Sequence, residues 1–469
     1  VLMLGLAAAF GPGTWLVGPR PALAQQETVV LTGGWLFDGT GDEVVRNPGI
    51  VVRAGKIMEV GADPERPDLA GARVVRLEPQ QYVLPGIFDL HAHYNVRVMG
   101  GPRLEEFDVM PVLYLANGAT STFPAGEYDP EGMHALRERI EAGDQIGPRL
   151  LSSGPYFGSA RPDWDESYTR DDIHRQVDEW VDRGVAGFKA KGIAPEHLRA
   201  LIERAHFHGL TVTGHLGSGY RNSVNPRDAI LMGIDRIEHF LGGDAFPADR
   251  SAYASFPEFR PDTREFRHIV ELYERHDVVY DATLTAYGYF AQPDEVFEQW
   301  VDESSFFVSD VRRWIEENDP QQYSERFDAI YRAKCALVRA FHEAGGTLTV
   351  GTDHVSNGRY LPAFGVHREM HAFVRCGIPP AAAIRAATIN GARALNRGDK
   401  FGTIEAGKFA DLLVVDGNPL DDIRNTRNVR LVMKAGELYD ARELLRSVEG
   451  RLDPPRADRT AEEGAGGGG

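Results

Sequence analysis

Short β-type runs alternate with helix-like segments over most of this chain, and this alternation limits the folds that it can adopt. Eight runs rich in apolar and β-branched residues can be counted, and helix-like stretches at 131–142, 170–183 and 195–208 lie between them. Strands connected through helices run parallel, because each helix returns the chain to the same end of the sheet. We therefore predict an α/β fold with a (β/α)8 TIM barrel over residues 83–401. Its strands would span 83–90, 119–123, 149–153, 187–191, 211–215, 236–240, 278–285 and 347–353.

The segments on either side of this region carry strands without helices. Residues 27–82 contain short β-type runs separated by Gly, Asp and Asn turns, and residues 402–445 repeat this pattern. Neither segment is long enough to build a substantial core by itself. We predict that the two combine into a small β-sandwich from which the barrel emerges.

Residues 1–24 are expected to be a truncated secretory signal peptide. They hold an apolar stretch broken by Gly and Pro and end in Ala22-Leu23-Ala24, but they lack the basic start of such peptides. We therefore expect an exported protein, periplasmic or extracellular, with no integral membrane span in the mature chain. The Gly-rich residues 452–469 are expected to form a disordered tail.

Composition excludes some partners. The chain has 469 residues, 42% of them hydrophobic, so it can bury a large core, and its net charge is −18. Acidic and basic residues are interspersed, which argues against nucleic acid or an anionic membrane surface as the main partner. The two cysteines, Cys335 and Cys376, favour buried inert thiols, although one disulfide could form in an oxidising compartment. Assembly into a homo-oligomer stays open.

Metal-ligand residues stand at the ends of the predicted strands. His91 and His93 are two residues apart, so both side chains leave one face of an extended strand, together with Asp89. Lys189, His215, His239 and Asp353 close four later β-type runs. A parallel barrel gathers the carboxyl ends of its strands on one face. Imidazole and carboxylate groups gathered there predict a divalent metal site.

This set of residues resembles the amidohydrolase superfamily, in particular its binuclear branch with prolidase-like and imidazolonepropionase-like proteins. The resemblance covers residues from about Val29 to Tyr439. It implies two divalent ions, expected to be zinc. The first would be held by His91, His93 and Asp353, the second by His215 and His239, and a carbamylated Lys189 would bridge them. Lys191 lies on the same strand face as Lys189, so the sequence leaves it as an alternative bridge.

The resemblance also implies a reaction. A metal-activated hydroxide would attack the carbonyl carbon of a small amide, cyclic amide or dipeptide and cleave its C–N bond, with Asp353 as catalytic proton carrier. Lactone or phosphoester cleavage, a mononuclear deaminase-type reaction, and a barrel that only binds a ligand are the alternatives.

Several other residues lie close to the predicted site. Tyr156, Arg161, Tyr287 and His354 follow strand ends and are candidates for substrate binding. Asp89 is expected to orient a ligand histidine. Strict strand alternation places Glu238 on the opposite face from His239, so we expect it to pair with a helix.

Overall fold

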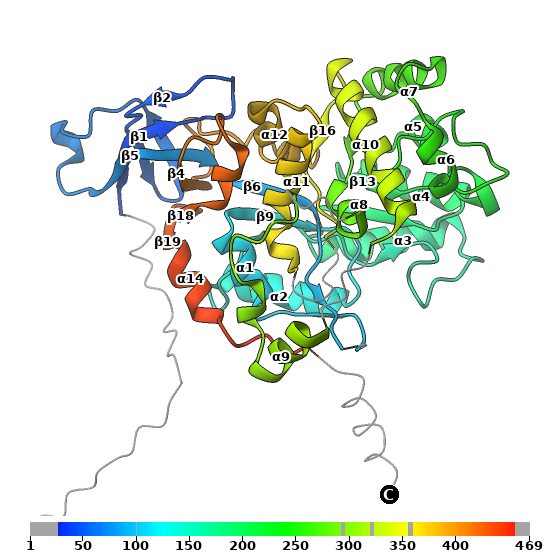
Figure 1. Cartoon of the computed structure of the whole chain (residues 1–469), viewed down its shortest axis with the longest axis horizontal. Helices are drawn as coiled ribbons and strands as arrows, with labels where there is room; N and C mark the ends of the chain where they lie inside the picture. The colour runs from blue at the N-terminus through cyan, green and yellow to red at the C-terminus, as the bar shows by residue number, and fades with distance from the viewer. Residues whose placement is uncertain (1–26, 100, 292–295, 319–322, 355–359, 455–469) are drawn as a thin grey trace, which may run out of the picture.

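The computed structural model describes residues 27–99, 101–291, 296–318, 323–354 and 360–454. Figure 1 shows a β-rich region, blue and orange to red, built from both ends of the chain, beside a larger region of strands and helices in cyan to yellow. The predicted signal peptide, 1–24, lies outside the described residues. Within the described ranges, no helix combines the length and apolar character needed to cross a bilayer.

A mixed sheet of eight strands joins the two ends of the chain. Its order is β19-β18-β17-β5-β1-β3-β4, and β2 pairs with β1. The strand β17 runs antiparallel to the end of β5, and this pairing unites the two terminal segments. Both terminal segments contribute strands to this one sheet, which agrees with the predicted shared β domain. That this domain forms a sandwich stays a prediction. The strands are β1 (Val29–Leu36), β2 (Val45–Arg46), β3 (Ile50–Arg53), β4 (Lys56–Val60), β5 (Arg73–Pro85), β17 (Leu412–Asp416), β18 (Val429–Lys434) and β19 (Glu437–Asp440).

The larger region contains two parallel sheets. One has the order β10-β9-β6, and the other runs β11-β12-β13-β14-β15-β16 in sequence order. A small antiparallel hairpin of β7 (Asn95–Val96) and β8 (Leu104–Glu105) follows the first strand. The parallel strands are β6 (Ile87–Ala92), β9 (Ala119–Pro124), β10 (Arg149–Leu150), β11 (Tyr156–Phe157), β12 (Gly187–Lys191), β13 (Thr211–His215), β14 (Arg236–Glu238), β15 (Val279–Asp281) and β16 (Leu348–Thr349).

Backbone hydrogen bonds connect the two parallel sheets at both of their edges. Leu90 N donates to Val350 O at 3.0 Å, which links β6 to the segment after β16, and Ala186 N donates to Ser152 O at 2.7 Å, which links the segment after β10 to β12. The buried guanidinium of Arg236, on β14, reaches Leu90 O on β6 at 3.0 Å. This mixed α/β arrangement is consistent with the predicted TIM barrel.

Helices lie between most of the parallel strands. The stretches predicted at 131–142, 170–183 and 195–208 are found as α2, α3 and α4. Asp129 caps α2 through Gly132 N, and Thr169 and Asp172 form a reciprocal capping box on α3. The α-helices are α1 (Met110–Ala116), α2 (Pro130–Ala142), α3 (Arg170–Asp182), α4 (Pro195–Phe207), α5 (Pro226–Met232), α6 (Ala252–Ser255), α7 (Arg264–Arg275), α8 (Leu284–Ala291), α9 (Ser309–Asn318), α10 (Glu325–Glu343), α11 (Gly365–Arg375), α12 (Pro380–Ala386), α13 (Ile389–Arg393) and α14 (Ala441–Val448). Short 3-10 turns span Pro67–Leu69, Tyr220–Asn222, Phe256–Glu258, Glu303–Phe306, Pro362–Phe364 and Ile423–Arg427.

Five of the eight predicted strands differ from those observed. The runs 149–153, 236–240 and 347–353 are shorter than predicted and hold only β10, β14 and β16, so Asp353 lies beyond its strand. The run 83–90 is divided, because residues 83–85 form the end of β5 in the terminal sheet and the next strand, β6, begins after Gly86. Only glycine fits there, since a Cβ would lie 2.1 Å from Thr120 Oγ1. The run 278–285 holds a three-residue strand, because Thr283 turns the chain with a φ of 48° and α8 begins at the next residue.

Two features near the C-terminal half differ from the expectations. Cys335 on α10 and Cys376 at the end of α11 form a disulfide, so the preference for two free thiols was wrong. Leu452 is the first residue of the segment expected to form a disordered tail, and it lies inside the described ranges. It is fully buried and forms backbone hydrogen bonds with Phe306 and Val308, so the expected disorder does not begin there. Residues 455–469 lie outside the described residues.

Candidate metal centre

Two histidines from β6 face one carboxylate. His91 lies within the strand and His93 directly follows it, so the two-residue period sends both rings to the same side. The His93 ring pairs with Asp353 through Nε2 and Oδ1 at 2.8 Å, and His91 Nε2 lies 3.5 Å from the same oxygen. These contacts bring the end of β6 and the segment after β16 together.

Asp353 occupies an uncommon backbone conformation. Its φ is 41°, and its amide donates to His91 O at 2.9 Å, which fixes the turn of the chain after Thr352. A non-glycine residue in this region is strained, and such strain persists where the surroundings hold it in place. Burial raises the pKa of the Asp353 carboxyl, but the hydrogen bond from His93 and the charge of that ring outweigh it and bring the value to about 2. The carboxylate is therefore ionised at neutral pH.

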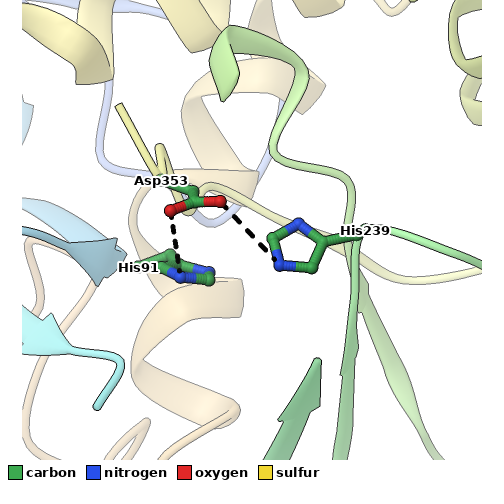
Figure 2. A group of neighbouring side chains, drawn as sticks. All are labelled: His91, His239 and Asp353. Carbon is green, nitrogen blue, oxygen red and sulfur yellow. Dashed lines mark ion pairs between the residues drawn. The ribbon is translucent and has the colours of Figure 1, made fainter. Parts of the chain in front are cut away.

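His239 approaches the same carboxylate from the other sheet. It directly follows β14, has a φ of 65°, and its Nε2 lies 3.9 Å from Asp353 Oδ2. Thr283 Oγ1 lies 2.6 Å from His239 Nδ1 and orients the ring. Figure 2 shows one carboxylate oxygen of Asp353 directed toward His91 and the other toward His239.

His215 ends β13 and completes the group of imidazoles. Its ring centroid lies 4.2 Å from that of His239, and the centroids of His91 and His239 are 5.2 Å apart. The structure thus brings together four histidines from three strands. Each of these strands contributes its carboxyl end, as the barrel prediction requires.

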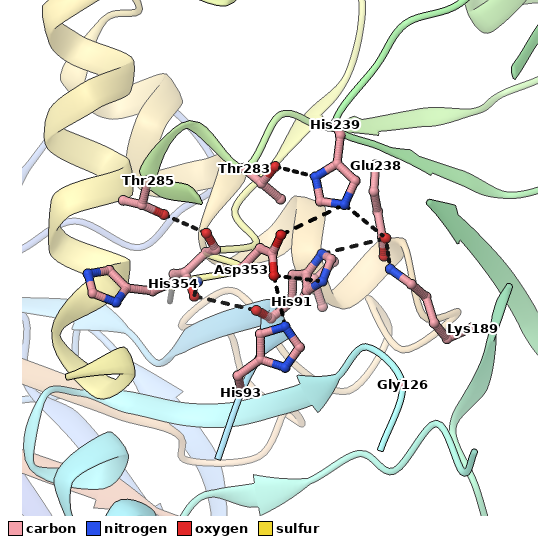
Figure 3. A network of polar contacts seen from close by, with 12 residues as sticks. His91, His93, Gly126, Lys189, Glu238, His239, Thr283, Thr285, Asp353 and His354 are labelled. Carbon is pink, nitrogen blue, oxygen red and sulfur yellow. Dashed lines mark hydrogen bonds and ion pairs between the residues drawn. The ribbon is translucent and has the colours of Figure 1, made fainter. Parts of the chain in front are cut away.

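Lys189 on β12 is one of the most deeply buried of the predicted ligands. Its side chain is 1% exposed and forms an ion pair with Glu238, whose Oε2 also lies 3.5 Å from His91 Nδ1. Burial lowers the pKa of the Lys189 ammonium well below its usual value, and the charge of Lys191 adds to this effect. Figure 3 shows Lys189 and Glu238 beside His239, on the opposite side of the group from His354.

Glu238 was placed on the wrong face by strand alternation. The residue is fully buried, accepts a hydrogen bond from Thr213 Oγ1 at 2.9 Å, and faces the ligand group. Alternation is correct up to Glu238, which shares its inward face with Arg236. His239 lies beyond the strand, and its left-handed φ turns its ring inward as well. The sequence feature that could have indicated this arrangement is the adjacent pair of Glu238 and His239 at the end of a strand.

Asp89 contacts the segments that carry the ligands through their backbone and Thr352, and not through a ligand ring as expected. Its carboxylate accepts hydrogen bonds from His91 N at 3.1 Å, Thr352 N at 3.0 Å and Thr352 Oγ1 at 2.9 Å. These bonds tie β6 to the segment that carries Asp353. Burial raises the Asp89 pKa to about 6 despite the three donors.

The donor set fits a divalent cation. One ligand atom each from His91, His239 and Asp353 lie within 4.8 Å of one another. Among the described residues, His91 Nδ1 and His239 Nε2 are buried without a hydrogen-bond partner, and burial holds the pKa of both rings well below its usual value. Neutral imidazoles offer lone pairs, and unsatisfied buried nitrogens are costly unless something binds them. This trio combines residues assigned to both predicted ions, so the division into two ion sites stays a prediction.

The predicted substrate residues have different surroundings. Tyr156 packs against Gly126, where a Cβ would meet its ring at 2.1 Å, and the Tyr287 ring centroid lies 6.2 Å from that of His239. His354 is buried, and Figure 3 shows its ring turned away from Asp353. The ring centroids of His354 and Phe297 are 6.2 Å apart. Arg161 pairs with Asp163 and Gln176 and stacks on Trp164, so the structure directs it toward α3.

A cavity of about 350 Å³ adjoins His215. Its wall combines serine and glycine residues with Leu216, Phe240 and Tyr253, and Lys191 lies on its β12 side. A concave, mainly apolar space beside candidate ligands is typical of a small-molecule site.

Comparisons with known proteins agree with this geometry. An imidazolonepropionase of Geobacillus sp. (strain WCH70) is 24% identical over 449 residues, covering 84% of this chain and 92% of its own. A solved Xaa-Pro dipeptidase with bound methionine in its active site aligns with a TM-score of 0.65 and 22% identity over 88% of this chain and 100% of its own. A putative prolidase from Bifidobacterium longum gives a TM-score of 0.64 and 24% identity over 90% and 99% of the two chains. At these identities, the solved structures show that the fold is shared.

A family model supplies the assignment. The model described as the amidohydrolase family matches residues 82–245 and 326–439, more than half of the chain. The matched ranges contain the six predicted ligands, His91, His93, Lys189, His215, His239 and Asp353. The chain therefore belongs to the amidohydrolase family and is similar to its prolidase-like and imidazolonepropionase-like members.

Proposed function

We propose that this protein is a metal-dependent hydrolase that cleaves a C–N bond in a small amide, cyclic amide or dipeptide at the mouth of a closed (β/α)8 barrel. The observation that carries the proposal is the convergence of neutral imidazoles, an ionised carboxylate and a buried lysine at strand ends. The named relatives support the reaction class. They include an imidazolonepropionase and a Xaa-Pro dipeptidase.

Two divalent ions, zinc in this proposal, would be held by two sets of residues. His91, His93 and Asp353 would hold the first ion, and His215 and His239 the second. When bound, such ions polarise a substrate carbonyl and lower the pKa of a water molecule. The remaining chemistry belongs to side chains of the chain itself.

Lys189 would bridge the two sets as a carbamate. Its lowered pKa favours the neutral amine, whose nitrogen can form a bond to the carbon of CO2 while a proton leaves. Glu238 touches Lys189 Nζ and is placed to receive that proton. The product presents two anionic oxygens in place of a cation, so the modification and the cations would stabilise each other.

Asp353 would move the proton of the reaction. Because its pKa is about 2, Asp353 is a free carboxylate at neutral pH and can accept a proton at Oδ2, the oxygen that faces His239. The same group can then deliver that proton to the departing nitrogen. The hydrogen bond that its backbone N–H donates to His91 O holds it in that position, despite its strained backbone.

Metal content and hydrolysis test this proposal together. The full chain is expressed with zinc and bicarbonate as wild type, Lys189→Ala and, as a matched control, Lys400→Ala at an exposed position. Hydrolysis of a panel of dipeptides, cyclic amides and lactones is measured beside zinc content. We expect about two ions per chain in wild type and in the control, and a loss of both zinc and activity in Lys189→Ala. Two ions retained in Lys189→Ala would refute the bridge.

A mononuclear hydrolase is the second candidate. The compact trio of His91, His239 and Asp353 favours it, since three ligands from three strands can hold one ion. One zinc per chain with full activity, unchanged by Lys189→Ala, would establish this form.

We also propose that the protein is exported. The Cys335–Cys376 disulfide supports this location, because disulfides persist in oxidising compartments and are rare in the cytosol. Fractionation of cells that express the full-length precursor tests the proposal, and recovery of the protein only from the cytosol would refute it.

A further inference from the structure

The side chains that line the cavity beside His215 differ in charge from the rest of this acidic protein. The chain carries 69 acidic residues against 51 basic ones. None of the described residues that line the cavity is acidic, and Lys191 is the one lysine or arginine among them. A cation in a cavity whose described lining holds no acidic side chain, in a chain with net charge −18, makes this cavity a local site for an anion.

Lys191 is placed to face the cavity from the ligand-bearing strand. It lies two residues after Lys189 on β12, on the same face but nearer to the carboxyl end, and it pairs in register with His215 on β13. Lys189 is 1% exposed, whereas Lys191 is half-buried. The two lysines therefore occupy different depths, with Lys189 among the ligands and Lys191 in the cavity wall.

The Lys191 ammonium forms no ion pair with a carboxylate among the described residues, although its charge acts on the Asp353 carboxylate of the ligand group. Its Nζ lies 5.6 Å from the ring centroid of Tyr156, in a cation–π contact. Most other buried or half-buried cations near the centre are neutralised or hydrogen-bonded. Lys334, for example, donates to the carbonyl oxygens of His239 and Ala282. An ammonium held beside a ring and next to an open cavity is available to an anionic ligand.

The rest of the cavity wall indicates which chemical group of the ligand lies next to its anionic group. Leu216, Phe240 and Tyr253 form an apolar side, and Phe240 and Tyr253 lie in edge-to-face contact with centroids 4.8 Å apart. Such a wall buries an apolar side chain favourably. The ligand class that matches both features is an organic carboxylate next to an apolar or aromatic group.

We propose that Lys191 binds the carboxylate of the substrate, and that the cavity selects amides of apolar amino acids with a free carboxyl group. This inference rests on the proposed hydrolase function and specifies its substrate class. His215, shared by the cavity and the ligand group, places the bound amide next to the centre. Lys191 is thus a substrate-binding residue, and the bridging role belongs to Lys189.

The test compares acids with their carboxamides. The zinc-loaded full chain is assayed with dipeptides that end in leucine, proline or phenylalanine and with the same dipeptides as C-terminal carboxamides. In wild type, kcat/KM for the acids should exceed that for the carboxamides by about 10- to 100-fold, the usual effect of a hydrogen bond to a charged group. Lys191→Met should bring this ratio close to one, mainly through a higher KM for the acids. Lys191→Arg keeps the charge and should retain most of the preference.

A general structural defect would give a different pattern. It would lower kcat/KM for acids and carboxamides alike and leave their ratio unchanged. Lys400→Met serves as the matched control, because Lys400 is exposed on the surface, and it should show the wild-type ratio. A wild type without preference for acids, or a Lys191→Met variant that keeps the preference, would overturn the inference.

Binding separates this inference from the proposed function. Calorimetric titration with N-acetyl-phenylalanine and N-acetyl-phenylalaninamide needs no turnover. If no amide is hydrolysed but the acid binds at least 10-fold more tightly, and Lys191→Met abolishes the difference, the hydrolase proposal fails while the carboxylate site stands. If amides are hydrolysed and neither assay shows a dependence on Lys191, the carboxylate site fails alone.

Discussion

The disulfide allows a quantitative prediction about stability. Cys335 and Cys376 are 41 residues apart in sequence, and together they are the chain's full complement of cysteine. A cross-link restricts the unfolded chain, and the chain-entropy relation for a loop of this length gives about 13 cal/mol/K. At 25 °C this corresponds to about 4 kcal/mol of stabilisation. Reduction should therefore lower the free energy of unfolding of the barrel by about that amount.

Denaturant unfolding of the oxidised and reduced protein measures the effect. The variant Cys335→Ala/Cys376→Ala should unfold at the denaturant concentration of the reduced wild type, and a reductant should not change it further. Because Cys376 is 6% exposed, replacing it with alanine exposes little new surface to solvent. A reduced wild type that unfolds at the same midpoint as the oxidised protein would refute the reasoning, because the bridge would then restrict nothing in the unfolded state.

Three further predictions concern the centre and the core. Asp353→Asn should lower kcat by about 100-fold or more, because an amide cannot carry the proton; assays at saturating substrate check this, and a near-normal kcat would exclude the role. Lys334→Met should weaken zinc binding about 10- to 100-fold by releasing the carbonyl of His239, which competition with a chromophoric chelator measures. An unchanged zinc affinity would show that the strand end holds its shape without Lys334. Burial, aided by the charge of Arg427, lowers the pKa of His367 to about 3. Between about pH 6.5 and pH 3, His367 is therefore protonated in the unfolded chain but stays neutral in the folded chain. Stability should thus fall by about 1.4 kcal/mol per pH unit from pH 6.5 toward pH 3 through this group, and His367→Gln should show a shallower acid slope in urea unfolding; an equal slope would contradict it.

Local periodicity was sufficient for much of the centre. The two-residue period of a strand placed His91 and His93 on one face, and the alternation of strands and helices indicated that His215, at the end of β13, would meet them. These inferences succeed because the direction of a side chain within a regular strand depends only on its position along that strand. The helices α2, α3 and α4 were predicted closely because their start signals are also local: Asp129 and Thr169 cap α2 and α3, and α4 begins with a proline.

Inferences failed where a strand ended. His239 and Asp353 have φ values of 65° and 41°, and Thr283 has 48°, so side-chain direction beyond the last paired residue follows the turn and not the strand period. That is why Glu238 and His239 both face inward. The division of 83–90 at Gly86 likewise depends on the approach of Thr120, which is distant in sequence.

The sequence by itself determined which residue types stand at the strand ends and which face each regular strand presents. The tertiary structure alone decided depth and partnership. Lys189 and Lys191 have the same chemistry and the same strand face, yet one contacts Glu238 in the interior and the other faces a cavity without acidic lining. Cys335 and Cys376 became partners because α10 packs beside α11. Periodicity is a property of a single segment, whereas burial, pairing and charge environment arise only when segments distant in the chain pack against one another.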